Sequence, residues 1–277
     1  MQQMQQMQQA PQISDQEFAH FQRFIFDAAG ITLAASKKML VTSRLGSRLQ
    51  RHDLGTYSEY LRLLASGQVP EEVQLAVDLL TTNETYFFRE PRHFEFMERQ
   101  LRNWLGQPQS QPLRVWSAAG SSGEEAYSIA MVLEDLLRGR AWEVLASDIS
   151  ARVLERARAG HYPMERARHI PSAYLQRFCL KGHGKQAQTL LIERNLRNKV
   201  HFQQINLNAR LPAIGQFDLV FLRNVLIYFN GDTKREVIAR ILSVLRPGGW
   251  LFIGHSETLN GISEAVQSVA PAIYRKL

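Results

Sequence analysis

The sequence predicts an α/β protein in which helices cover a parallel sheet and a small all-helical domain precedes it. Short apolar runs that suit strands alternate with helical segments between residues 113 and 254, as expected for a parallel sheet with crossover helices. The first 80 residues instead carry apolar side chains at helical spacing. The segment from His161 to Lys199 interrupts the alternation and contains two glycines and the pattern of a small hairpin around Thr189–Ile192. We therefore expect a small inserted β-subdomain over residues 161–200.

Helices account for the N-terminal domain. Ser14 and Glu17 have the spacing of a capping box, apolar residues follow at helical spacing, and Gly30 suits the end of the first helix. Pro70 suits the first turn of a later helix. The other helices expected here cover residues 36–53, residues 56–66 and a stretch from residue 70 onward.

The α/β domain is expected to cover residues 89–277, after a helical domain and linker at 13–88. Residues 1–12 contain Met-Gln-Gln three times, and a three-residue repeat drifts around a helix without making an apolar face, so they are predicted to be a disordered tail. The helices expected in the α/β domain cover residues 91–105, 123–138, 150–159 and 232–245. Its expected strands cover residues 113–117, 142–147, 200–205, 217–222 and 250–254.

The composition excludes several classes of protein. Hydrophobic residues make up 45% of the 277 residues and charged residues 21%, which is typical of a globular chain rather than a disordered one. The single cysteine, Cys179, excludes an internal disulfide, a C-x-x-C redox pair and a cysteine-based zinc site. The chain contains neither H-E-x-x-H nor G-x-S-x-G, so we predict no metal site and no serine hydrolase.

The net charge of +7 indicates an acidic partner, which could be a nucleic acid, an anionic membrane or an acidic protein. The most apolar stretch, Phe217–Phe229, contains charged residues and is shorter than the ~20 residues that a membrane span needs. The N-terminus has neither the basic nor the apolar region of a signal peptide. We therefore expect a cytoplasmic protein without direct membrane insertion.

The first motif, Val115–Ser128, is a strand, a loop of small residues and the start of a helix. Small residues let a ligand approach the backbone, and a helix N-terminus offers free N–H groups. The dinucleotide and P-loop patterns are absent. Glu124 and Glu125 would repel a phosphate but accept a ribose hydroxyl or a cation. The motif fits either a nucleoside without phosphates or an ordinary turn with acids at the helix start.

The second motif places Asp148 after the second strand of the predicted sheet. A carboxylate there can accept hydrogen bonds from both ribose hydroxyls, and Asp148 lies 25 residues after Gly123, which fits one crossover helix. The alternative is that Asp148 or Ser150 only caps the next helix. Together with the first motif, the pattern favours the ribose.

Two later motifs follow in the same domain. The strand within Asp218–Phe229 delivers Arg223, Asn224 and Tyr228 to its carboxyl end, where open α/β sheets bind ligands, although Tyr228 could also be a core aromatic. In Leu245–Gly254, Pro-Gly-Gly is predicted to end a helix and turn the chain into a strand. Such a turn late in an α/β domain is typical of S-adenosylmethionine-dependent methyltransferases.

Two further segments remain open to a functional or a structural interpretation. The polar and aromatic run Leu80–Glu90 lies at the junction of the two domains and could line a ligand cleft or serve as a linker. No acidic residue lies between Asp27 and Asp53, and four basic residues there share a ~60° arc of one helix. This arc could be a solvated face or a docking face for an acidic partner; it consists of Lys37, Arg44, Arg48 and Arg51.

Taken together, five motifs closely resemble the chemotaxis receptor glutamate O-methyltransferases, the CheR family. The resemblance extends in order from residue 14 to the C-terminus, and five motifs in register are far more specific than any one of them. The motifs are Thr81–Arg89, Ser117–Glu125, Ala146–Asp148, Phe221–Phe229 and Gly254–Glu257.

The resemblance implies a class I, Rossmann-like methyltransferase domain that binds S-adenosylmethionine between the domains and releases S-adenosylhomocysteine. It implies that Arg89 and Tyr228 lie nearest the transferred methyl group. It also implies that Asn206 and Leu207 flank the adenine and that Asp148 holds the ribose. The complete set of cofactor-lining residues that it implies is Asn83, Thr85, Arg89, Glu125, Asp148, Asn206, Leu207, Arg223 and Asn224.

The substrate implied by the resemblance is a glutamate on an acidic cytoplasmic helix of a chemoreceptor, and the basic arc would dock that helix. A glutamate has a pKa near 4.3, is already ionised at pH 7 and needs no general base. In some family members the inserted subdomain also grips the receptor's C-terminal tail. Gly182–Gly184 resembles that loop, but Thr189–Ile192 lacks the arginine that tail-binding members tend to carry. We expect a monomer.

Two other classes stay open. The basic charge also suits an RNA methyltransferase, although the Asn/Asp-Pro-Pro-Tyr motif of amino-group methylation on bases is absent. The other alternative is a non-catalytic module that binds S-adenosylmethionine and interacts with receptors.

Overall fold

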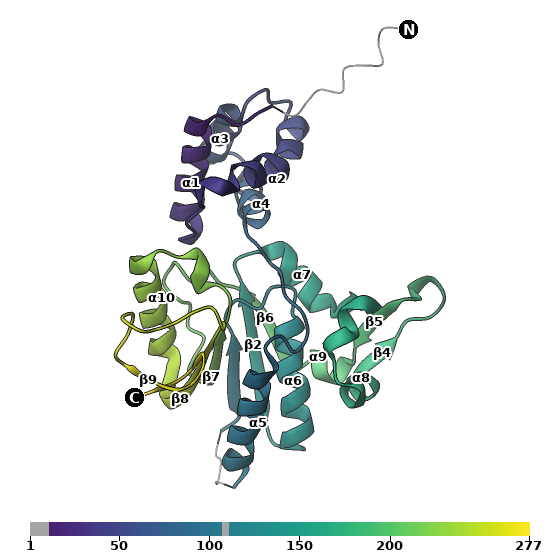
Figure 1. The fold of residues 1–277 in the computed structure, drawn as a ribbon. Helices are drawn as coiled ribbons and strands as arrows, with labels where there is room; N and C mark the ends of the chain where they lie inside the picture. Colours follow the sequence, from purple (N-terminus) through teal and green to yellow (C-terminus); the bar gives the residue numbers. More distant parts are fainter. Residues whose placement is uncertain (1–10, 107–110) are drawn as a thin grey trace. The chain divides into compact units, whose positions relative to one another are not determined.

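The computed structural model describes residues 11–106 and 111–277 (Figure 1). The chain divides into two compact units, residues 1–82 and 83–277. The division falls before the predicted start of the α/β domain at residue 89, so the segment 83–88 belongs to the second unit. Most of the predicted tail, residues 1–12, lies outside the described residues. None of the described helices is long and apolar enough to cross a membrane.

The first unit is helical, as predicted. The capping box forms, since the Ser14 hydroxyl accepts a hydrogen bond from the Glu17 backbone, and Gly30 ends the first helix with a φ of 72°. The core holds the rings of Phe21, Tyr57 and Tyr60, which are fully buried and pack against one another. After the 3₁₀ turn η1 (Ala35–Lys37), the chain continues into α2; the four helices described are α1 (Asp15–Ala29), α2 (Lys38–Arg51), α3 (Tyr57–Ala65) and α4 (Pro70–Leu80).

The second unit is built on a mixed sheet with the strand order β6-β2-β1-β7-β8-β10-β9. The neighbours from β6 to β8 are parallel, whereas β10 runs antiparallel to β8 and to β9. The strands are β1 (Leu113–Ser117), β2 (Trp142–Asp148), β6 (Val200–Gln204), β7 (Phe217–Leu222), β8 (Leu245–Ile253), β9 (Val266–Ala270) and β10 (Ile273–Lys276). The parallel strands were predicted; β9 and β10 were not, because β9 is half exposed and has no apolar run.

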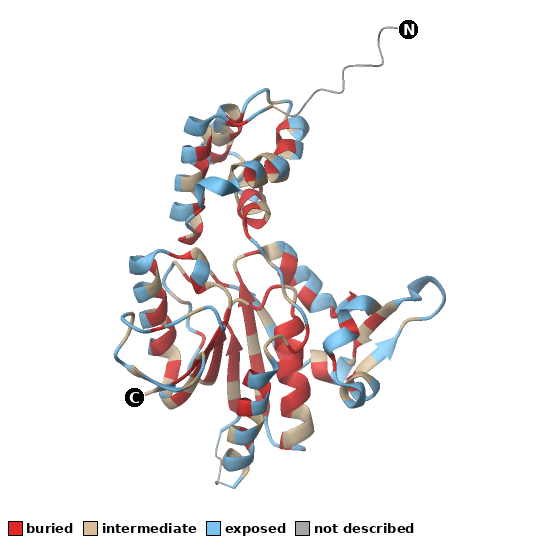
Figure 2. Ribbon diagram, viewed as in Figure 1, coloured by how far each residue is buried: buried red, intermediate tan, exposed pale blue. Residues whose placement is uncertain are grey.

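Helices α5, α6, α7 and α10 pack on this sheet, and all four were predicted within a few residues. Every residue of α6 from Glu124 to Leu133 is buried (Figure 2), which suits a helix that contacts α5 as well as β2 and β6. Their bounds are α5 (Pro91–Leu105), α6 (Glu124–Leu137), α7 (Ala151–Ala159) and α10 (Gly231–Val244).

The prediction for Pro-Gly-Gly was wrong. Helix α10 ends at Val244, before this segment, and β8 already begins at Leu245. Phe217 pairs with Leu245 but Leu219 pairs with Trp250, so residues 246–249 form a bulge within the strand. Gly248 takes a φ of 74° in this bulge, which explains why a glycine is needed there.

The insertion forms a second, three-stranded sheet in which β5 lies between β3 and β4 and pairs antiparallel with both. This confirms the small hairpin expected around residues 189–192, which consists of β4 and β5, and adds β3 as a further partner of β5. The insertion contains β3 (His161–Pro163), η2 (Met164–His169), α8 (Ser172–Phe178), β4 (Cys179–Lys181), η3 (Gly184–Gln186), β5 (Thr189–Ile192) and α9 (Arg194–Arg197).

Candidate functional site

The candidate site lies at the carboxyl ends of the parallel strands. Ser117, at the end of β1, pairs with Ala146 of β2 and with Phe221 of β7, so these three strands end close to one another. Asp148 is the last residue of β2, and the loop after β7 carries the predicted residues Arg223 and Asn224. Ligands of open α/β sheets bind at this edge. The structure therefore brings these predicted residues to one edge of the sheet, and the binding of a ligand there stays a prediction.

The loop between β1 and α6 is held tightly against its neighbours. The Gly120 N–H donates to the Ser147 carbonyl over 2.8 Å. Gly123 has a φ of 95°, and a Cβ there would come within 2.9 Å of the Ala157 Cβ and the Tyr162 hydroxyl. A side chain at residue 123 would thus be strained and would clash, so the glycine is needed for the helix to start here.

Asp148 anchors two backbone segments. It is 7% exposed, and its carboxylate accepts hydrogen bonds from the N–H groups of Ser121, over 3.0 Å, and Ser150, over 2.9 Å. The bond to Ser150 lies at the start of α7, so the alternative interpretation of a helix cap has support. A carboxylate has about four acceptor positions, so these two bonds do not exclude a ribose as well. The ribose role stays a prediction.

The two acids that begin α6 are occupied by protein partners. Glu125 is buried, and its carboxylate accepts from the Ser117 hydroxyl, over 2.7 Å, and from Arg223, over 2.9 Å. Burial raises the pKa of Glu125, and the Arg223 guanidinium opposes this shift. Glu124 is 1% exposed and pairs with Arg166 over 3.0 Å. Both carboxylates are therefore already paired with an arginine of the protein.

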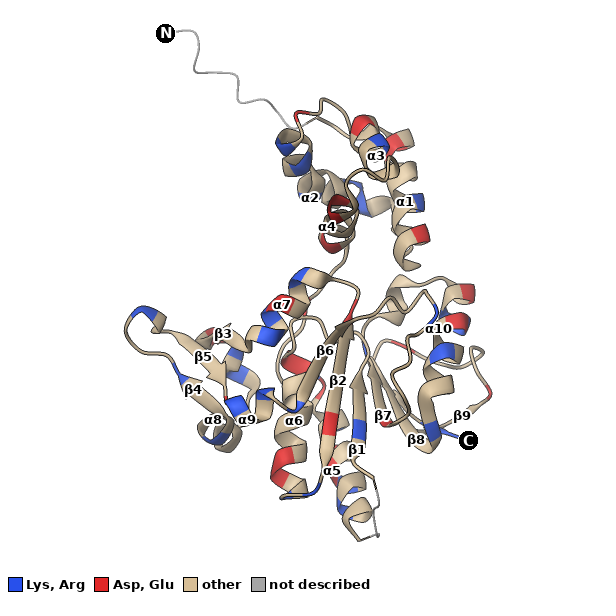
Figure 3. Ribbon diagram, turned by 180° about the vertical axis from the view of Figure 1, so that it is seen from behind, with Lys and Arg blue, Asp and Glu red and all other residues tan. Residues whose placement is uncertain are grey.

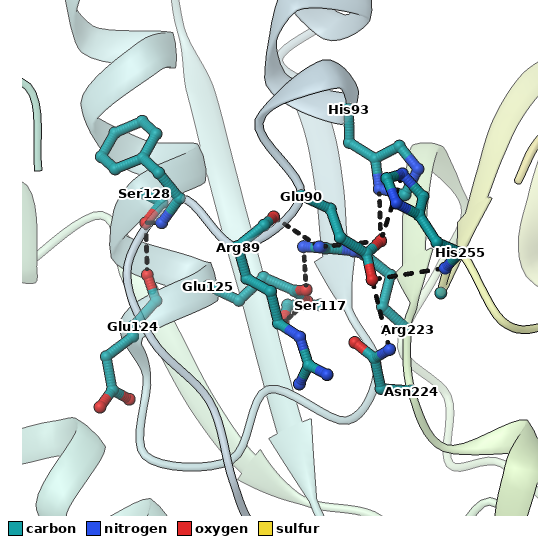
Figure 4. Close-up of polar contacts among 12 residues, drawn as sticks. Arg89, Glu90, His93, Ser117, Glu124, Glu125, Ser128, Arg223, Asn224 and His255 are labelled. Carbon is teal, nitrogen blue, oxygen red and sulfur yellow. Dashed lines mark hydrogen bonds and ion pairs between the residues drawn. The ribbon is translucent and has the colours of Figure 1, made fainter. Parts of the chain in front are cut away.

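Arg223 is the centre of a buried charge cluster (Figure 4). Its side chain is 1% exposed and pairs with Glu90, over 3.2 Å, as well as with Glu125. Burial alone would raise the pKa of Glu90, but Arg223, together with hydrogen bonds from His255 and Asn224, holds that pKa below its usual range. Sequence reasoning missed Glu90, although it immediately follows Arg89 in the quoted motif.

Two histidines border this cluster. His93 is fully buried, and burial and Arg223 lower its pKa to about 3, so it is neutral at pH 7. One ligand atom each from Glu90, His93 and His255 lie within 4.8 Å of one another, an arrangement that could hold a metal ion. The sequence search for metal motifs did not find this group, because residues 93 and 255 are distant in the chain. Since Arg223 already supplies positive charge beside Glu90, we assign no metal to it.

The segment that carries Arg89 is tied down on both sides. The Asn83 carbonyl accepts from the Ser121 hydroxyl over 2.8 Å, and the Thr85 carbonyl accepts from Arg166 over 2.7 Å. Further along, the Phe88 N–H donates to the Ser128 hydroxyl over 2.9 Å. The segment 83–89 is therefore fixed to the second unit by hydrogen bonds, and the cofactor-lining role of Asn83 and Thr85 stays a prediction.

Arg89 differs from Arg223 in its surroundings. Its backbone carbonyl accepts from Arg223, but its guanidinium points away from the charge cluster (Figure 4). That guanidinium donates to the Glu84 carbonyl over 3.1 Å and lies 5.8 Å from the centre of the Tyr86 ring. Among the described residues it forms no ion pair, so its charge is available to a ligand.

The remaining predicted residues lie on neighbouring loops. After β6, the Ile205 N–H donates to the Asp148 carbonyl over 3.1 Å, which brings the segment with Asn206 and Leu207 beside Asp148. Leu207 is 7% exposed and can offer an apolar surface to an adenine. Tyr228 ends the 3₁₀ helix η4 (Leu226–Tyr228) and is half-buried. No contact described for Tyr228 joins its side chain to Arg89, so its catalytic role stays a prediction.

Comparison with known proteins assigns the family. The CheR methyltransferase all-alpha domain matches residues 16–81, and the CheR methyltransferase SAM binding domain matches residues 83–274. This chain belongs to the CheR methyltransferase family. Its second unit accordingly is a domain that binds S-adenosylmethionine.

Relatives of the CheR family match over nearly the whole chain. The chemotaxis protein methyltransferase of Escherichia coli K12 is 40% identical over 95% of this chain and 91% of its own length. Chemotaxis protein methyltransferase 2 of Pseudomonas aeruginosa PAO1 is 41% identical over 94% of this chain and 92% of its own length. Among solved structures, TrmN from Thermus thermophilus is 16% identical, covers 65% of this chain and 48% of its own, and gives a TM-score of 0.40.

In this CheR chain, Glu257 holds the loop that carries the predicted residues Asn224 and Tyr228. Its carboxylate accepts from the N–H groups of Asn224 (3.0 Å), Ile227 (3.2 Å) and Gly254 (2.6 Å). A Cβ on Gly254 would come within 2.5 Å of the side-chain nitrogen of Asn224, so a side chain there would displace Asn224. The GHSE motif thus acts by positioning the loop after β7.

We expect Glu257→Ala to reduce kcat for methyl transfer about tenfold and to cost about 1–3 kcal/mol of stability, because three backbone donors lose their acceptor. Glu257→Gln retains one acceptor oxygen and should lose less of both. The measurement is kcat and urea denaturation for both variants. Equal kcat in wild type and Glu257→Ala would contradict the positioning role.

The basic arc of the N-terminal unit is not the open face that the sequence suggested. Arg44 donates to the carbonyls of Leu79 and Thr81 over 3.0 and 2.7 Å. Arg48 makes a two-bond contact with the carboxylate of Glu72, at 2.8 and 2.6 Å. Both are half-buried, and the structure leaves Lys37 and Arg51 as the exposed members. Helix α4 and the residue that follows it neutralise or bind the other two, which the spacing along α2 alone does not show.

Glu72 makes the stability of the N-terminal unit depend on pH. Burial would raise its pKa, but hydrogen bonds from Arg48, Tyr60 and His52 lower it to about 2. A carboxyl whose pKa is lower in the folded than in the unfolded protein stabilises the fold at pH values above its unfolded pKa. That stability is lost as the pH falls from near 4.5 toward 2. We expect Glu72→Gln to cost about 2–3 kcal/mol at pH 7 and little at pH 2. Urea denaturation of wild type and Glu72→Gln at pH 7 and pH 2 tests this prediction. An equal loss of stability at both pH values would contradict it.

Proposed function

We propose that this chain transfers the methyl group of S-adenosylmethionine to glutamate side-chain carboxylates on cytoplasmic helices of chemoreceptors. The products are glutamyl methyl esters and S-adenosylhomocysteine, and the reaction serves receptor adaptation. The names of the relatives, chemotaxis protein methyltransferases, support this substrate class. We further propose that the protein acts as a cytoplasmic monomer.

The observation that carries the proposal is the contrast between two arginines. Arg223 is buried and paired with Glu90 and Glu125, whereas among the described residues the Arg89 guanidinium contacts a backbone carbonyl and an aromatic ring and forms no ion pair. A guanidinium offers several donors in a planar fork that matches a carboxylate. Arg89 is therefore suited to hold a carboxylate, either that of the substrate glutamate or that of the cofactor.

The residues fit S-adenosylmethionine at this edge of the sheet. Asp148 has acceptor positions for ribose hydroxyls, and Asn206 and Leu207 adjoin it where an adenine would lie. Polar groups on the neighbouring loops are supplied by Asn83, Thr85 and Asn224. The ion pair of Glu125 with Arg223 adds charged groups to the same region. When bound, the cofactor supplies an electrophilic methyl group on its sulfonium.

In this reaction the protein positions the two reactants and excludes water from them. A glutamate is ionised at pH 7, so its oxygen can attack without a general base. Glu90, Glu125 and Asp148 are all held by protein partners, which agrees with a mechanism that does not call on them as bases. Good alignment of a nucleophile can contribute roughly 7–11 kcal/mol. Tyr228 is proposed to donate a hydrogen bond near the reacting centre.

The test is to follow labelled methyl from S-adenosylmethionine onto a helical fragment of a receptor cytoplasmic domain, and then to apply mild base. We expect release of labelled methanol, because carboxyl methyl esters hydrolyse under these conditions. Label that stays bound after base would indicate methylation of an amine or a nucleic acid. Cofactor binding without transfer to any receptor fragment would favour a non-catalytic module.

Two partner assignments remain proposals within this function. Lys37 and Arg51 are exposed and can contact an acidic helix. Arg44 and Arg48 would instead hold α2 in place through their bonds to α4. A receptor C-terminal tail could add to the β-subdomain near Gly182–Gly184. There Gly182 packs so closely on the Gln186 carbonyl that a side chain would clash, so the loop has a defined shape.

A further inference from the structure

The positive charge of this chain is concentrated in one region. Residues 151–199, which are α7 and the insertion, contain eleven Lys and Arg and three Asp and Glu, a net charge of +8. Residues 1–82 contain seven basic and eight acidic residues, and the rest of the chain contains fifteen of each. The whole net charge of +7 therefore comes from this region, and the N-terminal unit is not basic.

We propose that four exposed arginines of this region form a docking surface for the acidic helix that carries the target glutamate. The proposal rests on the proposed function and adds to it a site for the rest of the substrate. We call this surface the α7–η2 surface; it consists of Arg152, Arg156, Arg166 and Arg168. Figure 3 shows Lys and Arg gathered along α7 and over the insertion.

Contacts connect the two elements of this surface. Arg166 pairs with the buried carboxylate of Glu124 over 3.0 Å, and Arg156 also interacts electrostatically with Glu124. The Tyr162 hydroxyl, on β3 just before η2, donates to the Ser122 carbonyl over 2.7 Å. Both α7 and η2 thus flank the start of α6.

The surface also leads to Arg89. Arg166 donates to the Thr85 carbonyl over 2.7 Å, and the ring of His169 lies 4.8 Å from the ring of Tyr86. Tyr86 in turn adjoins the Arg89 guanidinium. A peptide whose carboxylate reaches Arg89 would therefore pass close to η2. This continuity with the candidate site distinguishes the α7–η2 surface from other basic residues of the insertion.

The chemistry of the partner follows from the charge and the spacing. Side chains three or four residues apart lie on one face of a helix, about 5–6 Å apart at their Cβ atoms. Arg152 and Arg156 have this spacing on α7, and so would successive glutamates on an acidic substrate helix. Arg156 and Arg168 form no salt bridge among the described residues, so their charge can act on a partner.

The experiment compares two double charge reversals of equal net charge. R156E/R168E alters the α7–η2 surface, and K181E/K185E alters exposed lysines around the β4–η3 loop of the same insertion. The substrate is a receptor fragment that ends before its C-terminal tail, so that tail recognition does not contribute. Affinity for S-adenosylmethionine, measured by calorimetry, and thermal unfolding show whether each variant is folded.

We expect R156E/R168E to raise KM for the fragment at least tenfold at low salt, with kcat changed less than twofold and cofactor affinity unchanged. K181E/K185E should change KM less than twofold. The difference between R156E/R168E and wild type should shrink as salt is raised, because salt screens exposed charges. Equal effects of the two double variants, or no effect of R156E/R168E, would overturn the proposal.

Direct binding of a fluorescent fragment, followed by anisotropy, separates this proposal from the proposed function. If wild type binds the fragment through the α7–η2 surface but transfers no methyl group, the docking surface stands and the assigned reaction fails. Anionic phospholipid vesicles and a single-stranded RNA serve as competing probes. Loss of vesicle or RNA binding in R156E/R168E, with fragment binding intact, would contradict the assignment to an acidic helix.

Discussion

Arg89→Ala is expected to reduce methyl transfer by about 10²–10³-fold, the range seen when a charged or polar group that orients the reacting atoms is removed. The reason is that Arg89 is the site arginine whose guanidinium has no acidic partner among the described residues, unlike Arg223. Arg89→Lys should recover only part of the loss, because a lysine cannot present two parallel donors to a carboxylate. The measurement is kcat and KM with a receptor fragment.

The same variant separates the two roles open to Arg89. If its guanidinium holds the substrate carboxylate, the Kd for S-adenosylmethionine should change less than threefold while transfer falls. If it holds the carboxylate of the cofactor, that Kd should rise at least tenfold. Arg92→Ala is a matched control, since Arg92 is exposed on the first turn of α5 and should leave both quantities unchanged. Near-normal turnover in Arg89→Ala would remove Arg89 from the mechanism.

The sequence predicted the parallel strands and the edge of the sheet at which the candidate site residues gather, because each depends on local signals. Apolar runs of five or six residues, a glycine loop and an acid after the second strand identify β1, β2 and β7 without knowledge of distant contacts. The antiparallel pair β9 and β10 lacks such a signal. It is stabilised by pairing with β8, which is a tertiary contact.

The roles of individual charges were less predictable than their positions. The prediction that Glu125 and Arg223 line the cofactor did not include their bond to each other, which the structure shows across 98 residues of sequence. Arg44 and Arg48 share a helical arc with Lys37, but α4 supplies carbonyls and Glu72 to the first two only. A helical wheel describes one helix, so it cannot show which charges a neighbouring helix neutralises.

Arg223→Met is expected to have the largest effect on stability, about 3–5 kcal/mol at pH 7, as measured by urea denaturation. The Arg223 side chain is 1% exposed and lies between Glu90 and Glu125. Methionine fills a similar volume but leaves two buried carboxylates without a cation. The triple variant E90Q/E125Q/R223M removes all three charges and should recover much of the loss. A cost below about 1 kcal/mol for Arg223→Met would contradict the paired cluster.

The pH dependence of this cost provides an independent check. Without Arg223, burial dominates and should raise the pKa of both carboxyls above their unfolded values. A raised carboxyl pKa makes the folded state bind more protons, so stability falls as the pH rises through that range. The stability difference between wild type and Arg223→Met should therefore be larger at pH 8 than at pH 5. A difference that is the same at pH 5 and pH 8 would mean that Arg223 stabilises the fold by packing rather than by neutralising Glu90 and Glu125.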